Sequence, residues 1–345
     1  ACMLTYTSPH KTGVERERER GPLCVCVSCE WFFLLPVPAM LSSSLWRVSS
    51  RNTTSSLWRM RRRTFGTENF FAKDESRTPT QRLVSGFEGF RQKYFVQSDN
   101  RALFEKLATG QAPKTLMVGC ADSRVDPAIV TDCGPGEIFM LRNIAAIVPP
   151  YSKDGSHHAT SAGLEYGVRA LGVENIIIMG HAKCGGVAGL GNPKDLEKLN
   201  FDFVQDWVKI VHPALEVVNS VFTPEAAKET GAPLPPQLQA SALEKAVVLT
   251  SLNNLLTFPW ILERVQNNTL QLYGWYFDLA KGQLLGFDPR VMRFVSLHSS
   301  EELVDSSTAF MNCADEPSKT AFLDSVRQTI INDCKHHSAC AGNHN

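Results

Sequence analysis

Residues 175–186 read N-I-I-I-M-G-H-A-K-C-G-G, and this stretch decides the fold class. A short apolar run that stops at polar residues and glycines predicts a strand buried on both faces of a sheet. Similar runs occur at residues 115–119 (T-L-M-V-G) and 137–142 (E-I-F-M-L-R). Strands of this kind are typical of a parallel sheet, so we expect the three runs to lie in one sheet.

Helical patterns separate and follow these runs. The sequence pattern predicts helices at residues 161–170 and 241–256, of which the second is long and amphipathic. It predicts two further strands at residues 270–278 and 283–287. Strands that alternate with helices indicate an α/β fold, with a central, mostly parallel β-sheet flanked by helices. Ligands of such folds bind at the carboxyl ends of the strands, so we expect a functional site at that edge of the sheet.

Two of the predicted strands end in metal-ligating side chains. Cys120 follows residues 115–119, His181 follows residues 175–180, and Cys184 comes three positions later. Two thiolates and one imidazole suit zinc and leave one of its four tetrahedral positions open, as in catalytic sites. A cysteine at a strand end is more often only a small buried residue. The carboxylate of Asp122 and the guanidinium of Arg124, close after Cys120, favour the metal site because they predict an ion pair beside it.

The composition excludes several classes of protein. Lys plus Arg and Asp plus Glu each number 35, so the formal net charge is zero, unlike the basic excess of most nucleic-acid-binding domains. No run of eighteen uncharged apolar residues occurs, which argues against a membrane-spanning helix. Ten cysteines in 345 residues are too sparse for a disulfide scaffold. We therefore expect no nucleic-acid partner and no membrane span.

The amino-terminal region differs from the rest of the chain. We predict a largely disordered extension over residues 1–81, a catalytic domain over 82–300 and a carboxy-terminal extension over 301–345. Residues 40–64 are rich in arginine and serine and lack acidic residues, which is typical of an organellar transit peptide. We place the transit peptide at about 40–65 and expect a mature chain from near Gly66. A disordered basic tail is the alternative, and a secretory signal at 31–40 is disfavoured by the mixed charges before it.

Five motifs together resemble the β-class carbonic anhydrases over roughly residues 82–290. They are C-x-D-S-R at 120–124, R-N-x-A at 142–145, S-A-x-L-E-Y at 161–166, G-H-x-x-C-G-G at 180–186 and S-L-x-N-L at 251–255. The resemblance implies the zinc-dependent reversible hydration of carbon dioxide to bicarbonate and a proton by zinc-bound hydroxide. It also implies a homodimer, or a dimer of dimers, with active-site clefts between subunits. We expect a mitochondrial enzyme, with chloroplast or cytoplasm as alternatives.

The resemblance assigns roles to ten residues. It implies that the ligands of one zinc per subunit are Cys120, His181 and Cys184, and that the catalytic dyad is Asp122 and Arg124. It further implies a substrate-binding or cleft-lining role for five residues: Gln111, Phe139, Ile144, Tyr166 and Gly185. Because the clefts of the family lie between subunits, we expect part of this second set to serve the neighbouring chain.

One departure from the family pattern concerns regulation. The bicarbonate-inhibited members carry a tryptophan, an arginine and a tyrosine, and here Met117, Arg142 and Phe277 occupy these positions. We therefore expect no inhibitory anion site, and Asp122 paired with Arg124. Two alternative functions stay open: hydrolysis of carbonyl sulfide or carbon disulfide on the same scaffold, and a non-catalytic zinc-binding or redox-sensing role. The Cys/His segment at 334–340 receives no role.

Overall fold

The computed structural model describes residues 76–230, 233–297, 303–309 and 316–342. The chain divides into two units, Ala1–Lys73 and Asp74–Asn345, and the described residues all belong to the second. The predicted transit peptide lies outside the described residues and stays a prediction. Within the described part, no helix is both long and apolar enough to cross a membrane.

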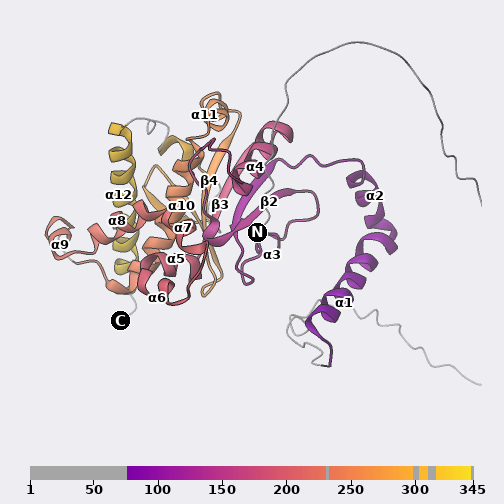
Figure 1. The fold of residues 1–345 in the computed structure, drawn as a ribbon, viewed down its shortest axis with the longest axis horizontal. Helices are drawn as coiled ribbons and strands as arrows, with labels where there is room; N and C mark the ends of the chain where they lie inside the picture. Colours follow the sequence, from indigo (N-terminus) through magenta and orange to yellow (C-terminus); the bar gives the residue numbers. More distant parts are fainter. Residues whose placement is uncertain (1–75, 231–232, 298–302, 310–315, 343–345) are drawn as a thin grey trace, which may run out of the picture. The chain divides into compact units, whose positions relative to one another are not determined.

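A six-stranded sheet forms the centre of this unit (Figure 1). Its order is β2-β1-β3-β4-β5-β6, with the first four strands parallel and the last two antiparallel to their neighbours. The strands are β1 (Thr115–Cys120), β2 (Ile138–Asn143), β3 (Asn175–His181), β4 (Gln271–Asp278), β5 (Gln283–Asp288) and β6 (Arg293–Ser296). The predicted α/β fold class is confirmed. Only the four-residue strand β6 was missed, because so short a segment shows no clear period.

Among the described residues, three helical segments precede the sheet along the chain, and the other helices follow its first strand. Helix α1 (Pro79–Arg91), the π-helix η2 (Gln92–Val96) and α2 (Ser98–Leu107) come before β1. The remaining α-helices are α3 (Pro127–Val130), α4 (Ala159–Glu165), α5 (Gly185–Gly191), α6 (Pro193–Lys198), α7 (Val204–Lys209), α8 (His212–Val221), α9 (Pro224–Thr230), α10 (Gln239–Leu255), α11 (Pro259–Gln266) and α12 (Glu316–Gly342). The short helical turns are η3 (Ile144–Ala146), η4 (Tyr166–Ala170), η5 (Pro236–Leu238) and η6 (Ser306–Ala309).

Helix α10 is buried around most of its circumference, which corrects the prediction of an amphipathic helix. Twelve of its 17 residues are buried. One side of α10 packs on β3 and β4, and α8 and α12 pack on its other sides (Figure 1). A helix covered on all sides carries apolar residues all round. The sequence pattern could not show this because the covering helix α12 lies about 60 residues further along the chain.

Helix α12 lies in the segment predicted to be a carboxy-terminal extension, and it contributes to the main core. Its buried apolar residues are Phe322, Val326, Ile330, Ile331 and Cys334. On α12, Asp333 also accepts a buried charge-assisted hydrogen bond from Lys245 of α10. Two charges removed from water are tolerated because they are paired. The helix is thus fastened to α10 by both apolar packing and an ion pair.

Candidate metal centre

The parallel register of β1 and β3 brings the predicted ligands together. Cys120 is the last residue of β1, His181 is the last residue of the neighbouring β3, and Cys184 precedes α5. The ligand atoms of these three side chains lie within 4.8 Å of one another, and all three residues are buried. The Sγ atoms of Cys120 and Cys184 are 3.9 Å apart. Tetrahedral zinc with Zn–S bonds of about 2.3 Å separates two sulfurs by about 3.8 Å, so the spacing fits this ion.

The imidazole of His181 is held in the orientation that a ligand needs. Its Nδ1 lies 2.9 Å from the carbonyl oxygen of Ala182. Because a carbonyl oxygen can only accept a hydrogen bond, Nδ1 carries the proton and the free lone pair of the ring lies on Nε2. Nε2 is buried and has no hydrogen-bond partner among the described residues. Such an orphaned polar atom is costly unless something binds it. A metal held by Nε2 and the two sulfurs accounts for the orphan, so the donor set fits zinc.

The carboxylate of Asp122 and the guanidinium of Arg124 form a close pair beside this cluster. Oδ1 of Asp122 accepts hydrogen bonds from the backbone N and from Nε of Arg124, both at 2.9 Å. Oδ2 accepts from Nη2 of Arg124 at 2.6 Å and lies 3.9 Å from Nε2 of His181. Nη2 also donates to the carbonyl oxygen of Lys183 at 3.0 Å, which links the two metal-bearing loops. Two parallel bonds of this kind fix both the position and the plane of the carboxylate.

The ionisation of these groups follows from the contacts. Arg124 holds the pKa of the Asp122 carboxyl well below its usual range, so Asp122 is a carboxylate across the physiological range. The Cys184 thiol lowers the pKa of Cys120, while the shared hydrogen bond and burial raise the pKa of Cys184. The thiol of Cys184 thus keeps its proton more readily than that of Cys120 does. A divalent cation that replaces this proton leaves two thiolates, which are the charged ligands that zinc prefers.

A comparison with protein families bears on this geometry. The family model described as "Carbonic anhydrase" matches residues 115–284, which include the three ligand residues and the Asp122–Arg124 pair. Beta carbonic anhydrase 3 of Arabidopsis thaliana is 37% identical over 203 residues, or 59% of this chain and 74% of the relative. The chain belongs to the β-carbonic anhydrase family. The resemblance found in the sequence is therefore confirmed.

A second relative and a solved structure support the same assignment. The carbonic anhydrase of Synechocystis sp. is 33% identical over 219 residues, covering 64% of this chain and 75% of the relative. The solved structure of the β-carbonic anhydrase CcaA superposes with a TM-score of 0.57 at 33% identity, covering 66% of this chain and 94% of that chain. Helix α12 lies beyond residue 284, where the family match ends.

Four of the five predicted substrate-binding and cleft residues of this family member fall into two groups. Ile144 and Gly185 border one pocket next to the metal-bearing loop. Phe139 and Tyr166 contact each other, with ring centroids 5.8 Å apart, and Tyr166 is half exposed. Phe139 lies four residues before Asn143, the residue that pairs with Cys120, which places it about 13 Å along the strand from that ligand. Gln111 is exposed between α2 and β1.

Arg142 has a structural task that its position in the sequence did not reveal. It was predicted only as the remnant of an anion site. Its Nε donates to the carbonyl oxygen of Cys120 at 2.9 Å, and its Nη2 donates to the carbonyl oxygen of Asp122 at 2.7 Å. Its Nη1 pairs with the carboxylate of Asp126 at 2.7 Å. The guanidinium therefore braces the loop that carries the first thiol and the dyad.

Two further residues near the metal loop were missed by the sequence analysis. Glu244 accepts a hydrogen bond from the backbone N–H of Cys184 at 3.1 Å, and it accepts another from the hydroxyl of Tyr276 at 2.7 Å. Burial raises the pKa of Glu244 above its usual value. Neither residue belongs to a recognisable motif, so only the fold reveals the contact.

In the Cys/His segment at 334–340, Cys334 is a buried core residue with a pKa raised by burial to about 11.

Proposed function

We propose that this chain catalyses the reversible hydration of carbon dioxide to bicarbonate and a proton. The observation that carries the proposal is a buried Cys–His–Cys group whose spacing fits zinc, with an ionised Asp122 directly beside it. Three protein ligands leave one zinc position open, as catalysis requires and as a closed structural site does not. A protein that only stores metal needs neither the carboxylate of Asp122 nor its partner Arg124.

The roles of the chain's own groups follow from their geometry. Cys120, His181 and Cys184 would hold the zinc, which supplies a Lewis acid that makes water acidic enough to react near neutral pH. Oδ2 of Asp122 faces the ligand cluster at 3.9 Å from Nε2 of His181, and its carboxyl stays ionised, so it would accept a hydrogen bond from a water molecule bound there. This bond would orient the water for attack on carbon dioxide. Arg124 keeps the acceptor in place.

The proposal is tested by stopped-flow measurement of carbon dioxide hydration with a pH indicator. We expect the purified chain to hydrate carbon dioxide, to lose the activity when a chelator removes its zinc, and to regain it when zinc is restored. Carbonyl sulfide and carbon disulfide are assayed on the same preparation, because the same ligand set would serve their hydrolysis. Hydrolysis of either compound in the absence of carbon dioxide hydration would reassign the substrate.

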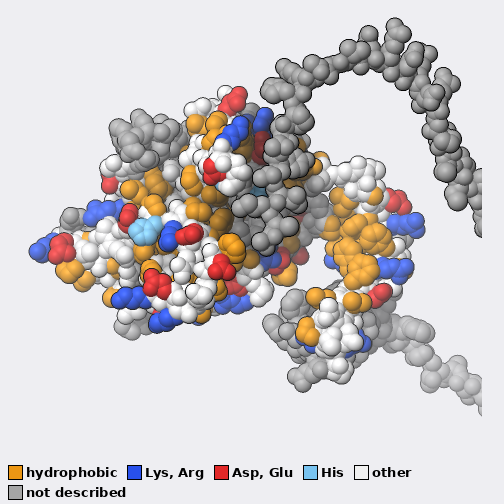
Figure 2. Space-filling view, in the orientation of Figure 1, with side chains coloured by type: hydrophobic (Ala, Val, Ile, Leu, Met, Phe, Trp, Pro, Cys, Tyr) orange, Lys and Arg blue, Asp and Glu red, His pale blue; other side chains and the backbone are white. Residues whose placement is uncertain are grey.

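A homodimer is part of the proposal. Helices α1 and α2 with η2 expose apolar residues on one surface (Figure 2). The exposed apolar residues of this surface are Leu83, Val84, Phe87, Phe90, Phe95, Val96 and Leu103. None of the residues of α1 or η2 is buried. A surface of this kind is typical of a subunit interface. Association would also bring Phe139 and Tyr166 of one subunit toward the cleft of the other, as the resemblance implies.

The oligomeric state is measured by sedimentation equilibrium. We expect a dimer or a dimer of dimers for the wild type, and weaker association for a variant with Phe87→Ser and Leu83→Ser. A wild-type chain that stays monomeric at micromolar concentration would contradict the dimer.

We also propose that the enzyme enters mitochondria. The support is the arginine-rich, acid-free composition of residues 40–64, which lie outside the described residues. A reporter fused to residues 40–70 should accumulate in mitochondria, and the same fusion with its arginines replaced by glutamine should not. Accumulation in chloroplasts or in the cytosol would contradict the mitochondrial assignment.

A further inference from the structure

The loop between His181 and Cys184 is held in a conformation that needs support from outside. Lys183 lies in the left-handed region with φ of 58°, which is unfavourable for a residue other than glycine. Such backbone persists only where the surrounding structure fixes it. Because this loop sets the distance between the imidazole of His181 and the thiol of Cys184, whatever fixes it also fixes the metal site.

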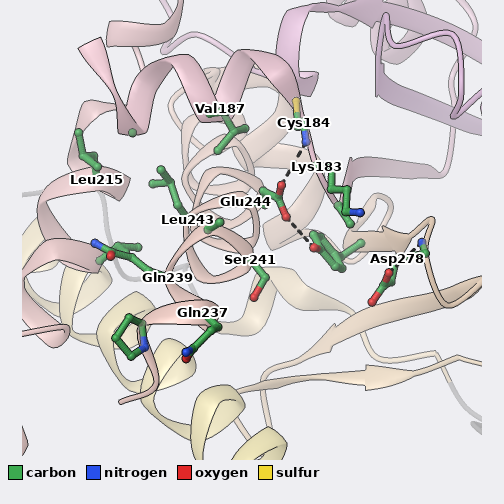
Figure 3. A pocket seen from close by; sticks show the side chains of 18 of the residues that line it. Lys183, Cys184, Val187, Leu215, Gln237, Gln239, Ser241, Leu243, Glu244 and Asp278 are labelled. Carbon is green, nitrogen blue, oxygen red and sulfur yellow. Dashed lines mark hydrogen bonds between the residues drawn. The ribbon is translucent and has the colours of Figure 1, made fainter. Parts of the chain in front are cut away.

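The two sides of this loop are supported differently. On one side, Arg124 donates to the carbonyl oxygen of Lys183 at 3.0 Å. On the other side, the loop borders a pocket of about 840 Å³ whose lining includes Lys183 and Cys184 (Figure 3), although the side chain of Cys184 itself is buried. Glu244 reaches the loop across the wall of this pocket and accepts the backbone N–H of Cys184 at 3.1 Å. The hydrogen bond to Glu244 therefore supports this side of the loop, in addition to the packing of Ala182 and Cys184.

Glu244 is itself fixed by its neighbours. The residue is 8% exposed and lies on α10, which approaches β3 so closely that a Cβ at Gly180 would lie 2.5 Å from Val248. The hydroxyl of Tyr276 donates to its second oxygen at 2.7 Å. The ring of Tyr276 lies 5.1 Å from the ammonium of Lys245, the residue next to Glu244. A buried carboxylate with both oxygens occupied has little freedom to move.

We propose that Glu244 is a positioning residue for the metal site, which holds the Cys184 loop at ligand distance through the backbone N–H of Cys184. This inference rests on the proposed zinc-dependent function and deepens it. Glu244 touches neither the metal-ligating atoms nor the Asp122–Arg124 pair, and it acts through the loop alone. Tyr276 orients the carboxylate. Residues that orient metal ligands in this way typically change metal affinity by about 10–100-fold when they are replaced.

The test compares three variants of the full-length chain with the zinc-loaded wild type. Glu244→Leu keeps the approximate volume and removes both acceptors, whereas Glu244→Gln keeps an acceptor for the Cys184 N–H. Thr250→Val is the matched control, because Thr250 is equally buried on α10 but donates only to the carbonyl oxygen of Ala246 within the helix. The measurements are the rate of zinc transfer to a chelator and the visible absorption spectrum of the cobalt-substituted protein.

We expect Glu244→Leu to lose zinc about 10–100-fold faster than the wild type and to shift the cobalt–thiolate absorption bands. Glu244→Gln should restore most of the wild-type behaviour, and Thr250→Val should match the wild type. A role in stability alone would lower the unfolding free energy of Glu244→Leu and leave the cobalt spectrum unchanged. Unchanged zinc transfer and an unchanged spectrum in Glu244→Leu would overturn the proposal.

If Glu244→Leu does not fold, Tyr276→Phe replaces it. This variant removes only the hydroxyl that orients Glu244, so we expect a smaller acceleration of zinc transfer, and wild-type behaviour would again overturn the proposal. The test of Glu244 can fail without contradicting the proposed function. A wild type that binds no zinc or does not hydrate carbon dioxide would contradict the function, whereas equal variants of an active wild type would contradict only the role of Glu244.

Discussion

Replacing Asp122 with asparagine removes a charge and leaves the shape of the side chain nearly unchanged. Oδ1 of Asp122 accepts two hydrogen bonds from Arg124 and Oδ2 accepts one. An asparagine therefore places its carbonyl oxygen at Oδ1, because the opposite orientation would set its NH₂ group against two donors. The NH₂ group then occupies the Oδ2 position, which is 3.9 Å from Nε2 of His181. The acceptor beside the metal site becomes a donor.

The size of the effect follows from the loss of that acceptor. A positioned group that accepts or orients a proton typically contributes about 10²–10⁴-fold to a reaction rate. We expect the hydration rate of Asp122→Asn to fall by at least about 100-fold, which corresponds to about 2.7 kcal/mol in the activation free energy. Zinc content should stay at the wild-type level, because all three ligand residues are intact.

The chain contains a matched control for this substitution. Asp288 and Arg290 repeat the same arrangement: Oδ1 of Asp288 accepts from the backbone N of Arg290 at 2.9 Å, and Oδ2 accepts from Nη2 at 2.9 Å. Gly286 pairs with Trp275, so Asp288 lies level with the start of β4 and about 13 Å along the sheet from the ligand end. Asp288→Asn breaks an equivalent ion pair and should leave the hydration rate unchanged.

The pH dependence of stability distinguishes loss of the ion pair from loss of catalysis. Arg124 lowers the pKa of Asp122, and Arg290 lowers the pKa of Asp288. A lowered pKa in the folded state contributes stability above the unfolded value of about 3.9, and the contribution is lost as the pH falls below it. Both variants should therefore differ from the wild type by a constant unfolding free energy between about pH 5 and 8, and the difference should shrink below about pH 4.

The assay combines stopped-flow hydration of carbon dioxide with zinc analysis of the same samples and with denaturant unfolding. The reasoning is refuted if Asp122→Asn hydrates carbon dioxide at the rate of Asp288→Asn while both retain zinc. Loss of zinc from Asp122→Asn without a prior loss of rate would instead identify Asp122 as a metal ligand.

Three further predictions concern the metal, the carboxy-terminal helix and regulation. Cys184→Ser exchanges a thiolate for a weaker ligand, so the zinc content after dialysis against a chelator should fall together with the activity. A variant that keeps its full zinc content and full activity would exclude Cys184 as a ligand. Asp333→Asn leaves the Lys245 ammonium buried without its charged partner, so the unfolding free energy measured by denaturant titration should fall by about 3–5 kcal/mol. Replacing both residues, with Lys245→Met and Asp333→Leu, should restore much of this stability. An Asp333→Asn variant as stable as the wild type would contradict the role assigned to the pair. Inhibition by bicarbonate should follow a simple hyperbola, because Met117 and Phe277 offer no hydrogen-bond donor for an anion; a sigmoidal inhibition curve would contradict this expectation.

The sequence was sufficient to predict the parts of the site that lie at strand ends. Cys120 and His181 end short apolar runs, and parallel strands bring their carboxyl ends to one edge of a sheet. Cys184 and Asp122 lie within three residues of these ends, so the chain itself keeps them near the site, although the exact conformation of the Cys184 loop depends on contacts from outside it. These residues also carry the motifs of the family, which made the fold class and the resemblance visible together.

The missed contacts depend on how distant segments pack. Glu244 lies 60 residues beyond Cys184, and no local pattern shows that the close approach of α10 at Gly180 brings the two together. Residues 241–256 were predicted to form an amphipathic helix, whereas the charged Glu244 and Lys245 are buried and Lys245 pairs with Asp333 of α12. The positions of Phe139 and Tyr166, away from the ligands of their own chain, likewise depend on packing that a single sequence does not encode locally.

The central claim is that Cys120, His181 and Cys184 bind a zinc ion with one open position. Zinc K-edge X-ray absorption of the purified wild-type enzyme measures this directly. The account predicts two sulfur scatterers at about 2.3 Å and two nitrogen or oxygen scatterers at about 2.0–2.1 Å, one of them exchangeable with solvent or substrate. A shell of four sulfurs, a shell without sulfur, or a preparation that carries no zinc would contradict it.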